Sequence, residues 1–242
     1  MILKGNRRMK VVIMAGGKGT RISSVASDIP KPMIKIEGKP VLEHELECLR
    51  DQGFTDIILT VSHLGNIIMD YFGDGSRVSP VTGKPFGVNI EYYFEKEPLG
   101  NAGALFKLKD KLTKDFLLLN ADAIFDIDFN RFIKYHKEKG GLVTLFTHPN
   151  SHPYDSGLIF ADKNNMVLHW SAKEDDRPTY YRNRVNAGLH VISPKILETE
   201  ITTPKVDLDR QLLKPLAGSG KMFCYDSPEY VKDMGTPDRY AA

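Results

Sequence analysis

Apolar and polar positions along this chain predict strands and helices in alternation. Short apolar runs, of the kind that form buried strands, lie at 10–14, 56–61 and 116–119. Amphipathic stretches separate them, and the clearest is 40–53, where Pro40 and Gly53 mark the two ends as helices prefer. Strands that alternate with helices in this way are typical of parallel sheets. We therefore expect an α/β fold.

The rest of the chain continues this pattern less regularly. Further strands are predicted at 88–95, 142–146, 157–161, 166–170, 185–192, 221–225 and 230–232. Further helices are predicted at 64–72, at 102–112, at 129–139 with Asp128 as its cap, from Ser193 onward, and at 207–216. Residues 76–87 are rich in Gly, Pro and Ser and predict an irregular excursion. No internal repeat or linker divides the chain, so we expect one α/β domain with an open, mostly parallel mixed sheet flanked by helices.

Composition narrows the class of protein. The 242 residues carry a formal net charge of +2, which gives no general reason to expect nucleic acid as a partner. Two cysteines without metal-ligand spacing favour a reducing cytoplasm. No apolar stretch approaches the 18 residues of a membrane span, and residues 1–9 lack the features of a signal peptide, so we interpret them as a flexible leader.

A candidate phosphate-binding loop follows the first predicted strand. Residues 14–21 read MAGGKGTR, and glycines there allow several backbone N–H groups to approach one anion. Thr20 adds a hydroxyl, and Arg21 adds a planar charged group suited to phosphate oxygens. Pro30 and Pro32 restrict the backbone on both sides of Lys31, which would hold that side chain in one direction. Alone, these features also fit a tight turn and a solvated lysine.

Aspartates follow two predicted strands. Asp122 comes just after the strand 116–119, at the carboxyl end where open α/β sheets bind ligands. A lone aspartate there is also common in turns, and we expect Asp126 and Asp128 to be caps. Asp233 follows the strand 230–232 in YVKDMGTP, a stretch that also suits ordinary helix initiation.

The pattern G-G-x-G-T-R at 16–21 followed by P-K-P at 30–32 resembles the signature of the sugar-1-phosphate nucleotidyltransferases, or nucleotide-sugar pyrophosphorylases. Further matches, from about 10 to 240, include EPLGNAGA at 97–104, LNAD at 119–122, YDSG at 154–157, VNAG at 185–188 and KDMGTP at 232–237. The resemblance implies a Rossmann-like nucleotidyltransferase domain at 10–242, with a nucleotide-binding part at about 10–125 and a sugar-phosphate-binding part at about 126–242. It also implies transfer of a nucleotidyl group from an NTP to a sugar 1-phosphate, giving an NDP-sugar and pyrophosphate.

The resemblance assigns roles to individual residues. It implies Arg21 and Lys31 as catalytic residues, and Asp122 and Asp233 as ligands of Mg²⁺. Implied nucleotide contacts are Ala15, Gly16, Gly17, Gly19, Thr20, Gly100 and Asn120. Implied sugar-phosphate contacts are Gly157, Lys173 and Asn186.

Several positions depart from the family pattern. Asn101 replaces the usual Thr, Ala121 replaces a Gly, and Lys173 stands between Ala172 and Glu174 where E-K-P is usual. A catalytically idle nucleotide-sugar-binding regulatory subunit therefore remains an alternative. The closing DMGTPDRY at 233–240 most resembles bacterial guanylyltransferases that act on mannose 1-phosphate or D-glycero-D-manno-heptose 1-phosphate. Uridylyl-, thymidylyl- and cytidylyltransferases stay open, and we assign no role to His63, His148, His152 or His169.

The expected partners are small molecules, NTP and sugar 1-phosphate, with no nucleic acid and no membrane. A homo-oligomer is left open. Only five residues follow Pro237, so a helix beginning there must be held by packing, which we expect through Tyr240. Some relatives continue into a phosphatase domain of the haloacid-dehalogenase type, and we expect the natural polypeptide to extend beyond Ala242 in the same way. The pathway implied is nucleotide-sugar supply for cell-surface polysaccharide.

Overall fold

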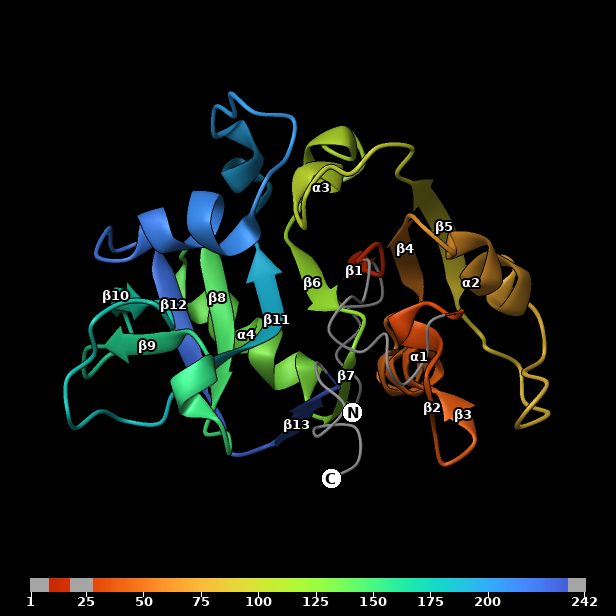
Figure 1. The fold of residues 1–242 in the computed structure, drawn as a ribbon, viewed down its shortest axis with the longest axis horizontal. Helices are drawn as coiled ribbons and strands as arrows, with labels where there is room; N and C mark the ends of the chain where they lie inside the picture. Colours follow the sequence, from red (N-terminus) through yellow and green to blue (C-terminus); the bar gives the residue numbers. More distant parts are fainter. Residues whose placement is uncertain (1–8, 18–27, 235–242) are drawn as a thin grey trace.

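A nine-stranded sheet runs through the centre of the computed structural model, which describes residues 9–17 and 28–234 (Figure 1). Its strand order is β10-β9-β11-β6-β1-β4-β5, with β8 paired to β11 and β12 paired to β8. The strands are β1 (Val11–Met14), β4 (Asp56–Val61), β5 (Asn89–Phe94), β6 (Phe116–Asn120), β8 (Val143–His148), β9 (Leu158–Ala161), β10 (Val167–Ser171), β11 (Val185–Ile192) and β12 (Met222–Asp226).

The first half of the sheet is parallel. β1 pairs in parallel with β4 and with β6, and β4 pairs in parallel with β5. Val11, Val12 and Ile13 have no exposed surface, because helices cover both faces of these strands. Val11 and Ile13 pack into one core and Val12 into the other, as the two-residue period of a strand requires. The carboxyl ends of β1, β4 and β6 consequently meet at one edge of the sheet.

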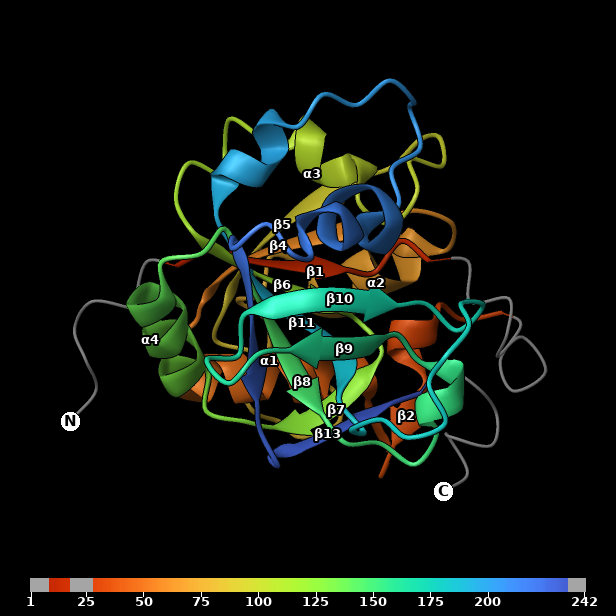
Figure 2. The ribbon, with the colours of Figure 1, turned by 90° about the vertical axis from the view of Figure 1, so that its left-hand side faces the viewer.

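The second half brings in antiparallel strands. β11 runs antiparallel to β6, β8 and β9, and β10 runs antiparallel to β9, whereas β12 and β8 are parallel. Figure 2 shows β9 and β10 at the outer edge of this half, with α4 (Phe129–Lys139) to one side. The expected mixed sheet flanked by helices is confirmed.

Three of the predicted helices form as the sequence indicates. α1 (Val41–Asp51) begins after Pro40, and α2 (Gly65–Phe72) buries Ile68 and Phe72. α4 begins at its cap Asp128, whose carboxylate accepts from the Arg131 N–H at 3.0 Å. It ends at Gly140, whose φ of 66° is the left-handed conformation that glycine adopts readily.

Other predicted helices are shorter or wound differently. The helix expected at 102–112 reduces to α3 (Gly103–Lys107), and no side chain caps it. Asn101 does not cap α3; its Oδ1 accepts from the Leu208 N–H at 2.7 Å instead. The helix expected at 207–216 is a π-helix, η5 (Leu208–Leu213), continued by the 3₁₀ turn η6 (Lys214–Leu216). The helix expected from Ser193 is the 3₁₀ helix η4 (Pro194–Glu198).

The sequence pattern did not predict the pairing of two short ribbons, although it predicted a strand at 230–232, which is part of one of them. β7 (Ala123–Asp126) pairs antiparallel with β13 (Tyr230–Asp233), and β2 (Lys35–Ile36) pairs with β3 (Lys39–Pro40). The interpretation of Asp126 as a cap is therefore wrong, because it ends β7. Met9, placed in the leader, packs against the core. The expected leader at 1–8 and the terminal helix after Pro237 lie outside the described residues.

Candidate active site

The loop after β1 approaches the ends of β4 and β5 closely. The Ala15 N–H donates to the Thr60 carbonyl at 2.9 Å, and the Gly16 carbonyl accepts from the Ser62 hydroxyl at 2.5 Å. A Cβ added at Gly16 would lie 3.0 Å from Oε1 of Glu95, whereas one at Gly17 would meet open space. The small residues thus let the backbone lie against Glu95. The predicted contacts Gly19, Thr20 and Arg21 lie outside the described residues.

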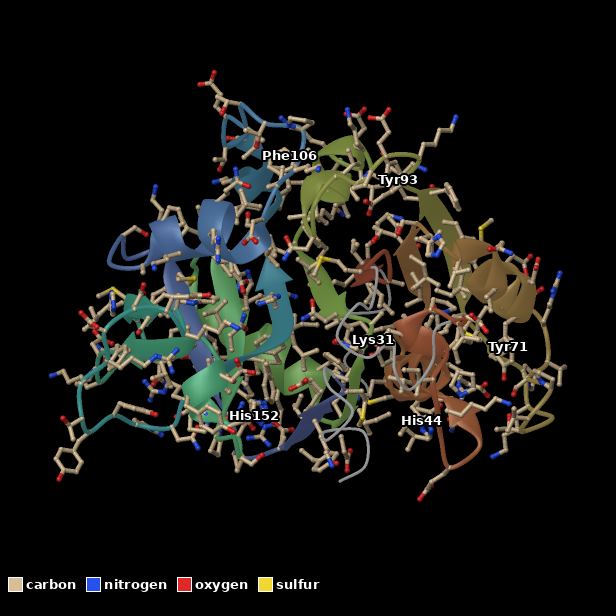
Figure 3. The ribbon with its side chains drawn as sticks, viewed as in Figure 1. Lys31, His44, Tyr71, Tyr93, Phe106 and His152 are labelled. Carbon is tan, nitrogen blue, oxygen red and sulfur yellow. The ribbon has the colours of Figure 1, made fainter. Side chains whose placement is uncertain are left out.

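Lys31 is directed inward by the turn that carries it. It begins the short 3₁₀ helix η2 (Lys31–Met33), with Pro30 before it and Pro32 after it. Its ammonium forms an ion pair with Oδ2 of Asp122, and its side chain is only 13% exposed. The lysine is therefore not a solvated surface group, and Figure 3 shows it near the middle of the molecule, between the two halves.

Asp122 and Asp233 are neighbours in the fold. Asp122 stands between β6 and β7, and Asp233 ends β13, where it lies opposite Ala123 in the ribbon. The Met234 N–H donates to the Asp122 carbonyl at 2.7 Å, which closes the ribbon at this end. Both aspartates line one cleft. The ribbon thus brings together two carboxylates that are far apart in the sequence.

The cleft has a volume of about 200 Å³ and contains four of the predicted site residues. Its lining consists of Asn101, Asn120, Asp122, His148, Asn150, Ser156, Asn186, Ala187, Gly188, His190, Leu208, Asp209, Val231 and Asp233. Gly188 has a φ of 75°, and a Cβ there would collide with the Asn120 amide. Glycine at this position therefore lets β6 and β11 approach each other at the floor of the cleft.

The remaining predicted contacts lie around this cleft. Gly100 has a φ of 80° and forms a bridge with Val206, whose backbone leaves no room for a Cβ. Gly157 packs on the Trp170 indole, and its carbonyl accepts from the Asn186 N–H at 3.3 Å. Nζ of Lys173 lies 3.4 Å from Oδ1 of Asp155, with about half of the lysine side chain exposed. Lys173 is thus outside the described lining.

Two histidines that the sequence left without a role lie beside Asp233. Nε2 of His152 is 3.5 Å from Oδ2 of Asp233, and His148 lines the cleft at the end of β8. Burial lowers the pKa of His148, and the nearby Asp233 carboxylate offsets part of that effect. In the sequence, the only sign of a role for His148 and His152 was their position after a predicted strand. That position alone could not show that they lie beside Asp233.

Glu45 supports the turn that presents Asp122. It is buried in α1, and its Oε1 accepts from the Ala123 N–H at 3.1 Å. Burial raises its pKa well above the ordinary value, and the Asp122 charge adds to that rise. The sequence signal was an acid on the apolar face of α1, close to Leu42 and Leu46.

Two further carboxylates were also missed. Glu95 follows β5, where Oε2 accepts from the Leu99 N–H at 3.4 Å and burial raises its pKa. Asp209 lies in η5 and lines the same cleft, and burial and then the Asp207 charge raise its pKa to about 6. Acids after a strand or in the first turn of a helix are common, so neither was distinctive in the sequence.

The Asp122 and Asp233 carboxylates can hold a hard divalent cation only if water or a bound substrate completes its coordination. Among residues 9–17 and 28–234 no group of three or more His, Cys, Asp or Glu side chains is arranged for a metal. Two carboxylates leave most positions of an octahedral ion for water and phosphate oxygens, as Mg²⁺ prefers. The pairing of Asp122 with the Lys31 ammonium shows that this position favours positive charge. The residues present therefore fit Mg²⁺.

Comparison with known proteins gives a consistent picture. A family model described as nucleotidyl transferase matches residues 10–241. UTP–glucose-1-phosphate uridylyltransferase from Synechocystis is 34% identical over 89% of this chain and 57% of its own length. Mannose-1-phosphate guanyltransferase 2 from Candida glabrata is 29% identical over 97% of this chain and 63% of its own length. The structure of HddC from Yersinia pseudotuberculosis complexed with GMP-PN superposes with a TM-score of 0.77, at 28% identity and 96% coverage of both chains.

The chain thus spans about three fifths of the length of these two curated relatives, and nearly all of the HddC chain. In the described residues, no helix is both long and apolar enough to cross a membrane.

Proposed function

This chain belongs to the nucleotidyl transferase family, and we propose that it transfers a nucleotidyl group from an NTP to a sugar 1-phosphate. The observation that carries the proposal is the cleft in which Asp122 and Asp233 meet, with Lys31 paired to Asp122. The proposed substrates are GTP and either mannose 1-phosphate or D-glycero-D-manno-heptose 1-phosphate. Similarity to a mannose-1-phosphate guanyltransferase and to a structure with GMP-PN supports this choice.

The reaction needs charge stabilisation and no activated side-chain nucleophile. An oxygen of the acceptor phosphate forms a bond to the α-phosphorus, and the bond from that phosphorus to the bridging oxygen of pyrophosphate breaks. Negative charge builds on the α-phosphate oxygens, and the Lys31 ammonium would stabilise it. Asp122 and Asp233 would hold Mg²⁺, which, when bound, neutralises phosphate charge. In this proposal Arg21 is a second catalytic cation, and Lys173 attracts the acceptor phosphate.

Glu95 supports guanine as the base. Its carboxylate lies against Gly16 and near Leu99, between the loop after β1 and the segment expected to contact the nucleotide. A carboxylate only accepts hydrogen bonds. Guanine presents two adjacent donors, N1–H and the N2 amino group, whereas the matching edges of uracil and thymine pair one donor with carbonyl acceptors. In our proposal Glu95 therefore binds the guanine edge.

Replacing Glu95 with Gln should reduce the preference for GTP. A glutamine turns one acceptor into a donor, so we expect kcat/KM for GTP to fall about 10- to 100-fold relative to that for UTP. Steady-state kinetics with both nucleotides measure this ratio. Glu198→Gln changes an exposed acid outside the cleft and serves as the control. An unchanged GTP/UTP ratio in Glu95→Gln would exclude Glu95 as the base contact.

Replacing Lys173 with Ala should raise KM for the sugar phosphate while leaving kcat within about threefold. The reason is that its charge contacts the acceptor phosphate equally in the ground state and the transition state. Its ion pair with Asp155 must open for this contact to form, and a half-exposed pair is weak enough to do so. An unchanged acceptor KM would mean that another group binds this phosphate.

Pyrophosphate release by purified 1–242, measured with a panel of NTPs and sugar 1-phosphates, tests the proposed function. We expect the highest rate with GTP and one of the two named acceptors, and a requirement for Mg²⁺. A folded sample that binds nucleotide sugars but releases no pyrophosphate would instead favour the idle regulatory subunit. Preference for another NTP would show that guanine is the wrong base, but it would leave the proposed reaction unchanged.

We also propose a place for the reaction. Both cysteines, Cys48 and Cys224, are free thiols, which supports a reducing cytoplasm. An NDP-sugar made there would serve glycosyl transfer into cell-surface polysaccharide.

A further inference from the structure

We propose that Asp209 recognises the acceptor sugar, its carboxylate accepting hydrogen bonds from ring hydroxyls while the side-chain amide of Asn186 donates to the same ring. The inference rests on the proposed function and deepens it.

Asp209 is a carboxylate in the cleft that the proposed chemistry does not use. It lines the cleft together with Asp122 and Asp233, but it comes from η5 and not from the β7–β13 ribbon. No hydrogen bond or ion pair joins its side chain to another residue in the described part of the chain, although it is mostly buried. A carboxylate in such a place is costly for the free protein unless a ligand or water provides donors.

The backbone around Asp209 is held from several directions. The Asp207 carboxylate accepts from the Arg210 N–H at 2.8 Å, and Asn101 accepts from the Leu208 N–H at 2.7 Å. Gly100 forms a bridge with Val206 just before η5, and Figure 1 shows this part of the chain coming close to α3. These contacts fix the start of η5, so the Asp209 carboxylate is presented to the cleft from a fixed position.

Asn186 faces the same cleft from β11 in a defined orientation. Its Oδ1 accepts from the Gly188 N–H at 3.3 Å and lies 3.1 Å from Nε2 of His190. Burial lowers the pKa of His190 to about 4, so the ring is neutral near pH 7. Because Oδ1 can only accept, its contact with Nε2 requires the tautomer that carries the hydrogen on Nε2. Because Oδ1 already accepts these hydrogen bonds, the amino group of the Asn186 side chain can donate to a molecule in the cleft.

These groups match the chemistry of a sugar ring. Each hydroxyl both donates and accepts, so a carboxylate together with amide N–H groups can satisfy neighbouring hydroxyls and read their configuration. The Asp209 charge also repels phosphate, whereas Lys31 attracts it. A sugar phosphate in this cleft is therefore oriented with its phosphate toward Lys31 and the Asp122–Asp233 pair, and its hydroxyls toward Asp209.

The nucleoside ribose is the other diol in the reaction, and the structure favours the acceptor. The loop after β1 and Glu95, where we place the nucleotide, belong to the first half of the sheet. Asp209 and Asn186 both come from the second half, on η5 and β11. The two substrates must meet at the Asp122–Asp233 pair, which leaves the Asp209 side for the acceptor.

Kinetics of Asp209→Asn and Asp209→Ala test the proposal in the full chain. We expect KM for the sugar phosphate to rise about 10- to 150-fold, the range for a hydrogen bond to a charged group, while KM for the NTP stays within twofold. Asp110→Asn, at an exposed acid outside the cleft, should change neither constant. An unchanged acceptor KM overturns the proposal, and a rise confined to the NTP places Asp209 at the ribose instead.

Deoxy sugars identify the hydroxyl contact directly. Monodeoxy analogues of the accepted sugar 1-phosphate should lose affinity for the wild type, and the analogue that lacks the hydroxyl bound by Asp209 should be insensitive to Asp209→Ala. Equal losses with every analogue would overturn a direct contact. Titrations with GDP-mannose and GDP read the same contact without turnover, because only the former should bind Asp209→Asn more weakly. These experiments test the role of Asp209 alone. The proposed function is tested separately, by the activity of the wild type.

Thermal stability separates this role from a structural one. The folded-state pKa of about 6 exceeds the ordinary value of 3.8, so ionisation disfavours folding, and stability is lost as the pH rises from about 4 through 6. The titratable groups around the carboxylate are Asp207, which caps η5, and four others that line the same cleft, Asp122, Asp233, His148 and His190. At pH 7 Asp209→Asn should therefore have an equal or higher Tm. A lower Tm together with raised KM for both substrates would indicate a structural role and overturn the proposal.

Discussion

Alanine at Asp122 or at Asp233 is expected to lower kcat about 10³-fold and to raise the Mg²⁺ concentration needed for half-maximal rate. The two carboxylates line one cleft although 111 positions separate them in sequence, and each would supply oxygen ligands that a hard cation needs. Loss of metal-based stabilisation of phosphate charge is worth several kcal/mol, which gives this magnitude. Steady-state rates over a Mg²⁺ titration measure both quantities.

Folding must be preserved for this result to carry weight. Asp56→Ala is the control, because it removes an acid of similar exposure that forms an ion pair with Lys10. This pair lies at the start of β1 and β4, whereas the loop after β1 and Ser62 follow the other ends of these strands. The variant should leave kcat unchanged. Asp122 and Asp233 variants should retain the circular dichroism spectrum of the wild type, since their ribbon is held by backbone pairing. In a ligand-bound structure, carboxylates more than about 10 Å apart could not share one ion with ligand distances of about 2.1 Å. That observation, or full activity of either variant, would end the assignment.

Alanine at Lys31 is expected to lower kcat about 10²- to 10³-fold with little change in KM for either substrate. Its charge matters most when the α-phosphate becomes pentacoordinate, so its removal costs more in the transition state than in the ground state. The ion pair with Asp122 already directs the ammonium toward the cleft, and Pro30 and Pro32 hold the turn that carries it. Single-turnover rates at saturating substrates would measure the chemical step itself.

Arginine at Lys31 should recover only part of the rate, because the larger planar group cannot take the same position beside Asp122. Lys10→Ala is the matched control, since it breaks a lysine–aspartate pair at 2.9 Å outside the cleft. If Lys31→Ala raised KM and left kcat unchanged, the lysine would be a binding group and not a catalytic one.

The sequence determined the parts of the fold that depend on local pattern. Continuous apolar runs predicted β1, β4 and β6, because parallel strands that are covered on both faces are apolar at nearly every position. Asp128 marked the start of α4, because the role of a cap at a helix terminus is local. The family motifs likewise indicated Lys31, Asp122 and Asp233 before any geometry was available.

Only the tertiary structure decided how distant segments combine. The β7–β13 ribbon places Asp233 beside Asp122, and a four-residue strand with mixed burial has too little periodicity to be predicted. The Asn101–Leu208 hydrogen bond joins residues 107 positions apart, so no local pattern around Asn101 could predict it. Asp209 and Glu95 have the same local pattern as many exposed acids. Their burial, and hence their raised pKa and their place in the site, arises from elements that pack against them, which local sequence does not encode.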